Sequence, residues 1–140
     1  MSSIQFHPNE LLLIYNDTHT NSVKQTRAYA RSISNHVNEV HLDNTKLTTT
    51  LWKEIVNKLE LKPKDLLDKS KPEYQEKVRG NDFTMEGWLE VLNHNPQLLK
   101  APMAFYNNKA VLCVKPTDIL KLDISSISNN KIPPHLRHES

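Results

Sequence analysis

The stretch IYNDTHTNSVKQT, Ile14 to Thr26, passes from an apolar segment through a polar elbow into an amphipathic segment. The apolar run Leu11 to Tyr15 is typical of a strand that is buried on both faces of a parallel or mixed sheet. After the elbow, a mainly apolar series recurs at spacings of three and four, so a helix is predicted to begin near Thr20 or Asn21; the series is Val23, Thr26, Ala30, Ile33 and Val37. The stretch therefore predicts a strand, a polar connection and a helix.

A second strand and a crossover are predicted by the residues that follow this helix. Val40 and Leu42 alternate with polar neighbours in NEVHLD, which indicates a short strand. Its distance along the chain from the first strand suits a right-handed strand–helix–strand crossover. Ala30, on the inner face of the helix, would let the helix pack close to the sheet. These segments together predict an α/β fold.

Two longer helices are predicted where apolar residues share one helical face. In TTTLWKEIVNKLE this face is built around Trp52, and Thr49 or Thr50 is available to cap the free amides at the helix start. In TMEGWLEVLNHN the face includes Met85, and Thr84 is the predicted cap. Both helices should contribute to the core.

Prolines and one asparagine pair mark the remaining elements. Pro63, Pro72 and Pro116 each stand where a helix could begin, because proline lacks only a donor that the first turn leaves unpaired anyway. MAFY and KAVLCV flank Asn107-Asn108, whose residues tolerate positive φ, so these two runs predict an antiparallel hairpin.

The composition excludes several classes of protein. A chain of 140 residues fits one domain with a core that needs no disulfides. The longest apolar run, Leu11 to Tyr15, is far too short to cross a bilayer. The 18 Lys and Arg residues are interspersed with 16 Asp and Glu residues, so nucleic acid binding has little support. One cysteine and no signal-like N-terminus predict a cytoplasmic location, and the histidine spacing indicates no metal site.

Short motifs occur in a fixed order between residues 11 and 122, namely IYND with KQT, LLDKSKPEY, FT, NPQLLKAP and LCVKP. In order and spacing they resemble the arsenate reductase family, which also contains redox-sensing transcription regulators that bind RNA polymerase. The resemblance implies a thioredoxin-like α/β fold with a mixed four-stranded sheet, a helical insertion and helices on both faces. We expect residues 1–10 to form an N-terminal extension, residues 11–123 the thioredoxin-fold domain and residues 124–140 an irregular C-terminal tail.

The nucleophile of the family has no counterpart in this sequence. Active members carry a cysteine at the start of the first helix, in a pattern that resembles Cys-x-x-x-Arg. Aligning Lys24 with that arginine places Thr20 at the cysteine position. Reduction of an oxyanion requires a thiolate, whereas a threonine hydroxyl hardly ionises at neutral pH. No residue is therefore predicted to be catalytic.

Other positions of the family's oxyanion site differ as well. The resemblance implies arginines where this chain has Asp68 and Ala101, and a third arginine whose place Lys115 takes. Arginine binds oxyanions bidentately, so a carboxylate and a methyl group at these positions should weaken arsenate binding. The family also places a cis proline beside its active site, and Pro102 would supply it here, although the sequence does not determine whether the Ala101-Pro102 bond is cis.

The elbow leaves one binding alternative open. Thr20, Asn21 and Ser22 could present the free amides of a helix start to a small anion, and Lys24 and Lys115 could support it with positive charge. Ordinary capping of the helix also explains the elbow residues and is the favoured interpretation.

Cys113 and His19 are the remaining candidates for chemistry. Cys113 lies among apolar residues of the predicted hairpin, so we interpret it as a packed structural thiol. His19 lies at the elbow and could donate a proton, but no nucleophile accompanies it, which favours a solvent-facing loop histidine.

The leading hypothesis is an arsenate-reductase-like protein without thiol redox activity that has a binding or regulatory role. One alternative is a glutaredoxin-coupled arsenate reductase. The other is a protein-interaction module that resembles the polymerase-binding regulators. The expected partner is an unidentified protein, a small oxyanion has weaker support, and no cofactor, metal or membrane is expected.

Overall fold

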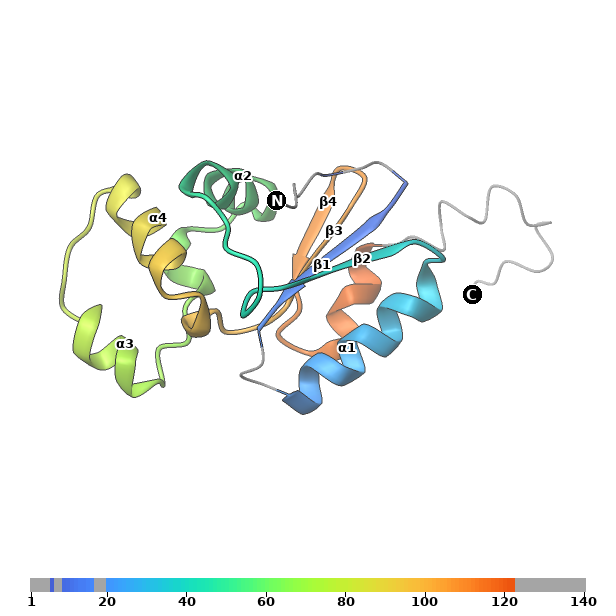
Figure 1. The fold of residues 1–140 in the computed structure, drawn as a ribbon, viewed down its shortest axis with the longest axis horizontal. Coiled ribbons are helices and arrows are strands. Elements are labelled where there is room, and N and C mark those ends of the chain that lie inside the picture. The colour runs from blue at the N-terminus through green and yellow to red at the C-terminus, as the bar shows by residue number, and fades with distance from the viewer. Residues whose placement is uncertain (1–5, 7–8, 17–19, 123–140) are drawn as a thin grey trace.

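The computed structural model describes residues 6, 9–16 and 20–122, with Thr20 described by its backbone alone. The elements in chain order are β1 (Leu11–Tyr15), α1 (Thr20–Ile33), β2 (Val37–His41), α2 (Thr49–Leu59), the 3₁₀ helix η1 (Pro63–Leu66), α3 (Pro72–Lys77), α4 (Met85–His94), η2 (Pro96–Leu98), β3 (Met103–Tyr106), β4 (Lys109–Leu112) and η3 (Pro116–Leu122). Helices α2 and α4 cover one face of a four-stranded sheet, whereas α1 and η3 cover the other (Figure 1).

Strand β1 forms the centre of the sheet, and all of its residues are buried. It pairs in parallel with β2, where Leu11 lies opposite Val37, and antiparallel with β3, where Leu12 lies opposite Phe105. Strand β4 completes the order β2-β1-β3-β4. The predicted α/β fold, with a mixed four-stranded sheet and helices on both faces, is therefore confirmed.

The helix after the elbow is shorter than the sequence predicts. Helix α1 ends at Ile33, and Val37 opens β2 instead of continuing the apolar face of the helix. The carbonyl oxygen of His36 accepts a hydrogen bond from the amide of Leu11 at 2.8 Å, so pairing with β1 holds this segment as a strand. Leu42 lies directly after β2, and its amide still donates to the last residue of β1 at 2.8 Å.

Two apolar clusters, one on each face of the sheet, form the core. The larger cluster joins the sheet to α2 and α4, and the smaller one joins it to α1 and η3. Side chains of β1 alternate between them: Leu12 and Ile14 enter the larger cluster, whereas Leu11 and Leu13 enter the smaller one. Ala30 is fully buried in the smaller cluster, where its small side chain lets α1 approach the sheet.

Threonine residues cap α2 and α4, although one cap differs from the prediction. Thr84 caps α4 as predicted, since its hydroxyl oxygen accepts from the amide three residues later at 3.1 Å. The cap of α2 is Thr48, whose extended backbone lets its hydroxyl oxygen accept from the amide of Leu51 at 3.1 Å. The predicted caps Thr49 and Thr50 already lie inside the helix.

Met85 departs from the predicted apolar face of α4. Its side chain is 53% exposed. It lies in the first turn and borders an open hollow with Thr49 and Lys53 instead of closing onto α2. Farther along the same face, Leu89 takes the buried position.

The proline-started helices and the hairpin form where the sequence predicts them, but η1 and η3 are 3₁₀ helices. Asn107 has a φ of 58°, which lets the tight turn join β3 to β4. Within residues 9–16 and 20–122, no helix is long and apolar enough to span a membrane.

A half-buried carboxylate ties β2 to α1. Glu39 accepts hydrogen bonds from the Tyr15 hydroxyl at 3.0 Å and from Arg27 Nε at 2.7 Å, and it pairs with Arg31 at 2.5 Å. Arg27 also lies over the Tyr15 ring, 5.7 Å from its centroid. Burial opposes ionisation of this carboxyl, but the hydrogen bonds from Tyr15 and Arg31 and the charge of Arg27 outweigh burial and lower the pKa of Glu39.

Replacing this carboxylate by an amide, Glu39→Gln, should lower the free energy of unfolding at neutral pH by about 1–2 kcal/mol. A carboxyl with a lowered folded pKa stabilises the fold above its unfolded pKa, near 4.5, and this stabilisation is lost as the pH falls through the folded value. Urea unfolding at about pH 3 should therefore show a smaller difference between wild type and variant. Glu54→Gln, on the exposed face of α2, is the matched control, and an equal difference at both pH values would contradict the prediction.

Candidate functional site

Several segments of the chain surround an open hollow of about 350 Å³ beside the start of α1. They are the first turn of α1, the connection from η1 to α3, the residues before β3 and the segment just after β4. The lining residues are Ser22, Asp68, Ser70, Lys100, Ala101, Pro102 and Val114. The topology thus brings together side chains that lie far apart in the sequence.

Backbone pairing fixes Asp68 and Lys100 in the wall of this hollow. The amide of Asp68 donates to the carbonyl oxygen of Leu98 at 2.7 Å, and the amide of Lys100 donates to that of Leu66 at 2.9 Å. The leucine pairs that precede Asp68 and Lys100 are fully buried. Burial of these leucines therefore sets the polar residue after each pair at the rim of the hollow.

Asp68 and Lys100 bring opposite charges to the same small space. Oδ1 of Asp68 accepts hydrogen bonds from the amide of Ser70 at 3.1 Å and from its hydroxyl at 2.6 Å, which orients the carboxylate. Lys100 is half-buried. The described lining residues therefore do not gather the several cations that bind an oxyanion tightly.

Comparisons with known proteins bear on the fold. No family model and no curated protein matches the sequence. Solved structures do match: an arsenate reductase from Vibrio cholerae shares 15% identity over 81% of this chain and 98% of that chain, with a TM-score of 0.67. The chain has the arsenate reductase fold. A Yersinia pestis protein that is provisionally named an arsenate reductase shares 18% identity over 80% of this chain and 99% of that chain, with a TM-score of 0.68. An arsenate reductase (ArsC) related protein from Brucella melitensis shares 13% identity over 80% of this chain and 92% of that chain, with a TM-score of 0.58.

Within the arsenate reductase fold, the hollow brings together only part of the predicted site. Ser22 and Pro102 both line it. Thr20 opens α1, and Asn21 follows it with an exposed side chain that is not part of the lining. His19, at the elbow, lies outside the described residues.

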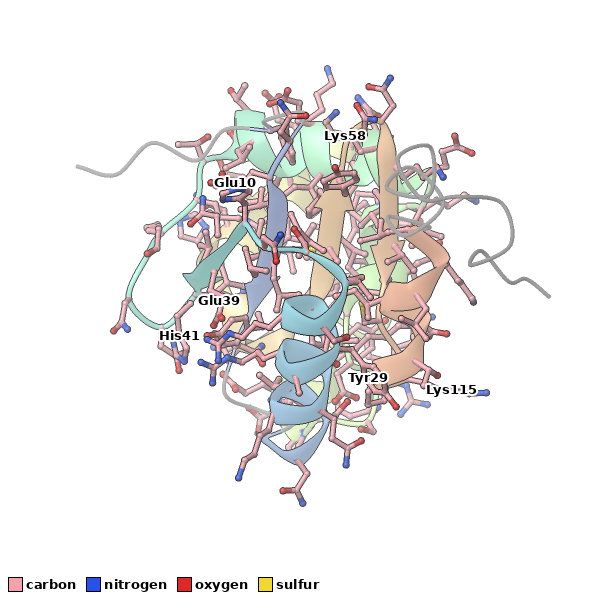
Figure 2. All side chains as sticks on the ribbon, turned by 90° about the vertical axis from the view of Figure 1, so that its right-hand side faces the viewer. Glu10, Tyr29, Glu39, His41, Lys58 and Lys115 are labelled. Carbon is pink, nitrogen blue, oxygen red and sulfur yellow. The ribbon has the colours of Figure 1, made fainter. Side chains whose placement is uncertain are left out.

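The two predicted cations do not line the hollow. Lys24 lies two residues after Ser22, and two residues along an α-helix turn a side chain by about 200°, so Lys24 is exposed on another side of α1. Lys115 is exposed, and Figure 2 shows it pointing outward, across α1 from Glu39. An anion site that uses both lysines stays a prediction that this arrangement does not support.

Sequence reasoning did not assign Ser70 and Lys100 to the site. Both lie close in sequence to positions that the resemblance did single out. Ser70 follows Asp68 by two residues, and Lys100 directly precedes the Ala101-Pro102 pair. Their closeness in sequence to these positions is thus the signal that could have pointed to Ser70 and Lys100.

The peptide bond before Pro102 is trans, and the described residues contain no cis peptide bond. Pro102 therefore does not supply the family's cis proline in this structure, a point that the sequence leaves open. A trans bond is intrinsically favoured before proline by about 0.5–1 kcal/mol. The backbone hydrogen bonds on either side form while this bond is trans. The amide of Lys100 donates to the carbonyl oxygen of Leu66, and the amide of Cys113 donates to the carbonyl oxygen of Pro102 at 2.8 Å.

Cys113 is a packed thiol, as predicted from its apolar neighbours. It is fully buried just after β4, in the cluster that contains Val23, Ala30 and Ile119, and it does not line the hollow. Burial raises the pKa of this thiol to about 12, and the charge of Asp118 adds to the shift. The chain's one cysteine is thus protonated and inaccessible.

Metal binding gains no support from the geometry. In the part of the chain that the structure describes, no three His, Cys, Asp or Glu side chains gather closely enough to hold a metal ion. The expectation that the whole chain needs no metal or cofactor stays a prediction.

Proposed function

We propose that this chain is a member of the arsenate reductase family that has lost thiol redox chemistry and acts by binding another protein. The observation that supports this proposal best is the state of Cys113, the one cysteine of the chain, which is buried away from the hollow with a raised pKa. The position that the resemblance gives to the nucleophile is held by Thr20.

The chemistry of the hollow also disfavours a reductive role. A reductase of this type needs a thiolate that attacks the oxyanion and cations that hold it. The carboxylate of Asp68 lies in the wall and repels an oxyanion, whereas Lys100 supplies one positive charge. A small anion is consequently a weaker candidate ligand than a protein surface. The single cysteine is compatible with a reducing cytoplasm, which we propose as the location.

Arsenate-dependent turnover tests the absence of reductase activity. With arsenate, glutathione and glutaredoxin, the protein should show no consumption of reducing equivalents above the rate without protein. An active arsenate reductase in the same mixture verifies the assay. Turnover that disappears in the Cys113→Ala variant would overturn the proposal, because it would show that the buried thiol reacts.

A further inference from the structure

Strand β2 carries an open edge. It is the first strand of the order β2-β1-β3-β4, and among residues 6, 9–16 and 20–122 it pairs only with β1. In a parallel ladder, alternate residues turn both backbone groups toward the same neighbour. His36 and Leu42 bond to β1, so Val37 and Glu39 turn their amides and carbonyl oxygens away from it. Within the described chain, these four backbone groups have no backbone partner on that side.

A positively charged stripe of α1 runs beside this edge. Lys24, Arg27 and Arg31 recur at spacings of three and four and therefore share one side of the helix. Glu39 is only 17% exposed and is already engaged by the two arginines, whereas Arg31 is 60% exposed. Figure 2 shows Glu39 and His41 together on this side of α1. The stripe thus keeps unneutralised positive charge along the middle of the edge, with Glu10 and Asp43 near its two ends.

A second hollow, of about 320 Å³, opens at the carboxyl end of the same strand. Its lining begins at Leu42, directly after β2, and its apolar walls come from Leu42, Leu47, Trp52 and Pro96. Asn93 also lines it.

We propose that the edge of β2 and this second hollow together bind an extended, acidic segment of a partner protein. The segment adds as a strand beside Val37 and Glu39, its carboxylates face the stripe on α1, and one apolar side chain enters the hollow. At about 3.3 Å per residue, about eight residues span both features.

Two other occupants fit the charges less well. If two copies paired antiparallel through β2, the positive stripes of both α1 helices would lie on the same face of the joined sheet and repel each other. The segment 124–140 carries Lys131 and Arg137 against a single acidic residue, Glu139, so it is not an acidic strand. The inference does not depend on the absence of reductase activity, because it uses a different edge of the molecule from the hollow beside the start of α1.

The test uses a synthetic peptide with acetyl and amide ends, of sequence SEVEVELS, and the full chain labelled with ¹⁵N. Saturable binding should appear below about 1 mM peptide at low salt. The amide protons of Val37 and Glu39 should become protected from hydrogen exchange. The double variant Lys24→Glu with Arg31→Glu should bind about tenfold more weakly. Lys69→Glu, an exposed charge reversal on the connection from η1 to α3, should bind like wild type.

A second peptide, SKVKVKLS, carries lysines in place of the three glutamates and so reverses the charge of the peptide instead of that of the protein. It keeps the test valid if the charge variants fold poorly, because it requires no change to the protein. Equal affinity for both peptides, no binding of SEVEVELS up to about 1 mM, or binding without protection at Val37 and Glu39 would each overturn the inference. If these amides are protected in a dimer without peptide, a second copy occupies the edge and the inference is overturned. If they are protected without peptide and the protection is lost when residues 124–140 are deleted, the chain's own tail occupies the edge and the inference is likewise overturned. Peptide binding together with arsenate turnover would refute the proposed function and leave this inference standing.

Discussion

Trp52→Ala should lower the free energy of unfolding by about 3–5 kcal/mol, the range for removing a large buried aromatic side chain. Trp52 is 1% exposed and lies in the larger apolar cluster between α2 and the sheet. Its loss removes apolar contacts and leaves a cavity that the fixed backbone of α2 cannot close. Since small domains are stable by about 5–15 kcal/mol, the variant should lose a large part of its stability.

Urea unfolding followed by circular dichroism measures this loss without relying on tryptophan fluorescence, which Trp88 would then dominate. Lys53→Ala is the matched control, because this exposed neighbour on α2 should change stability by no more than about 0.5 kcal/mol. A loss below about 1 kcal/mol for Trp52→Ala would show that α2 does not pack on the sheet as described.

The thiol of Cys113 should react with a disulfide reagent such as DTNB at least about a thousandfold more slowly in the native protein than in urea. With a pKa of about 12 instead of 9.0, the thiolate at about pH 8 falls from roughly one part in ten to one part in ten thousand. Full burial excludes the reagent as well. Reaction should therefore require transient opening of the cluster between α1 and η3.

This rate is simple to measure because no other cysteine is present. Unfolded protein, in which the same thiol is free, is the internal control. Cys113→Ala should remove all labelling and keep the fold. Labelling of native protein at the rate of a free thiol would contradict the buried position, and it would also weaken the proposed loss of redox chemistry.

The sequence predicts the scaffold well because strong local patterns decide it. The run LLLIY, the helical periodicity after the elbow and the Asn107-Asn108 turn each specify their own element, and the structure forms all three. Boundaries were less predictable where tertiary pairing competes with periodicity. Val37 continues the helical spacing, yet its neighbour His36 pairs with β1, and the segment becomes a strand. The cap of α2 shifted to Thr48 because capping depends on backbone angles that composition does not fix.

The candidate site was only partly predictable, since it is built by contacts between distant segments. The resemblance singled out Pro102 and Asp68, but the pairing of Asp68 with Leu98 and of Lys100 with Leu66 follows from the fold. The sequence likewise did not predict the open edge of β2. It depends on the strand order, which no local pattern of VNEVH specifies.

The central position of β1 constrains how the protein can be made in a cell. Strand β1 is synthesised before the other three strands, but its partner β3 follows about ninety residues later, where Leu12 meets Phe105. At about 5–20 residues per second, a ribosome needs roughly 5–20 seconds to reach that point. Throughout this interval the nascent chain carries an apolar strand with one side unpaired, and such an edge is prone to aggregation until the hairpin has been synthesised.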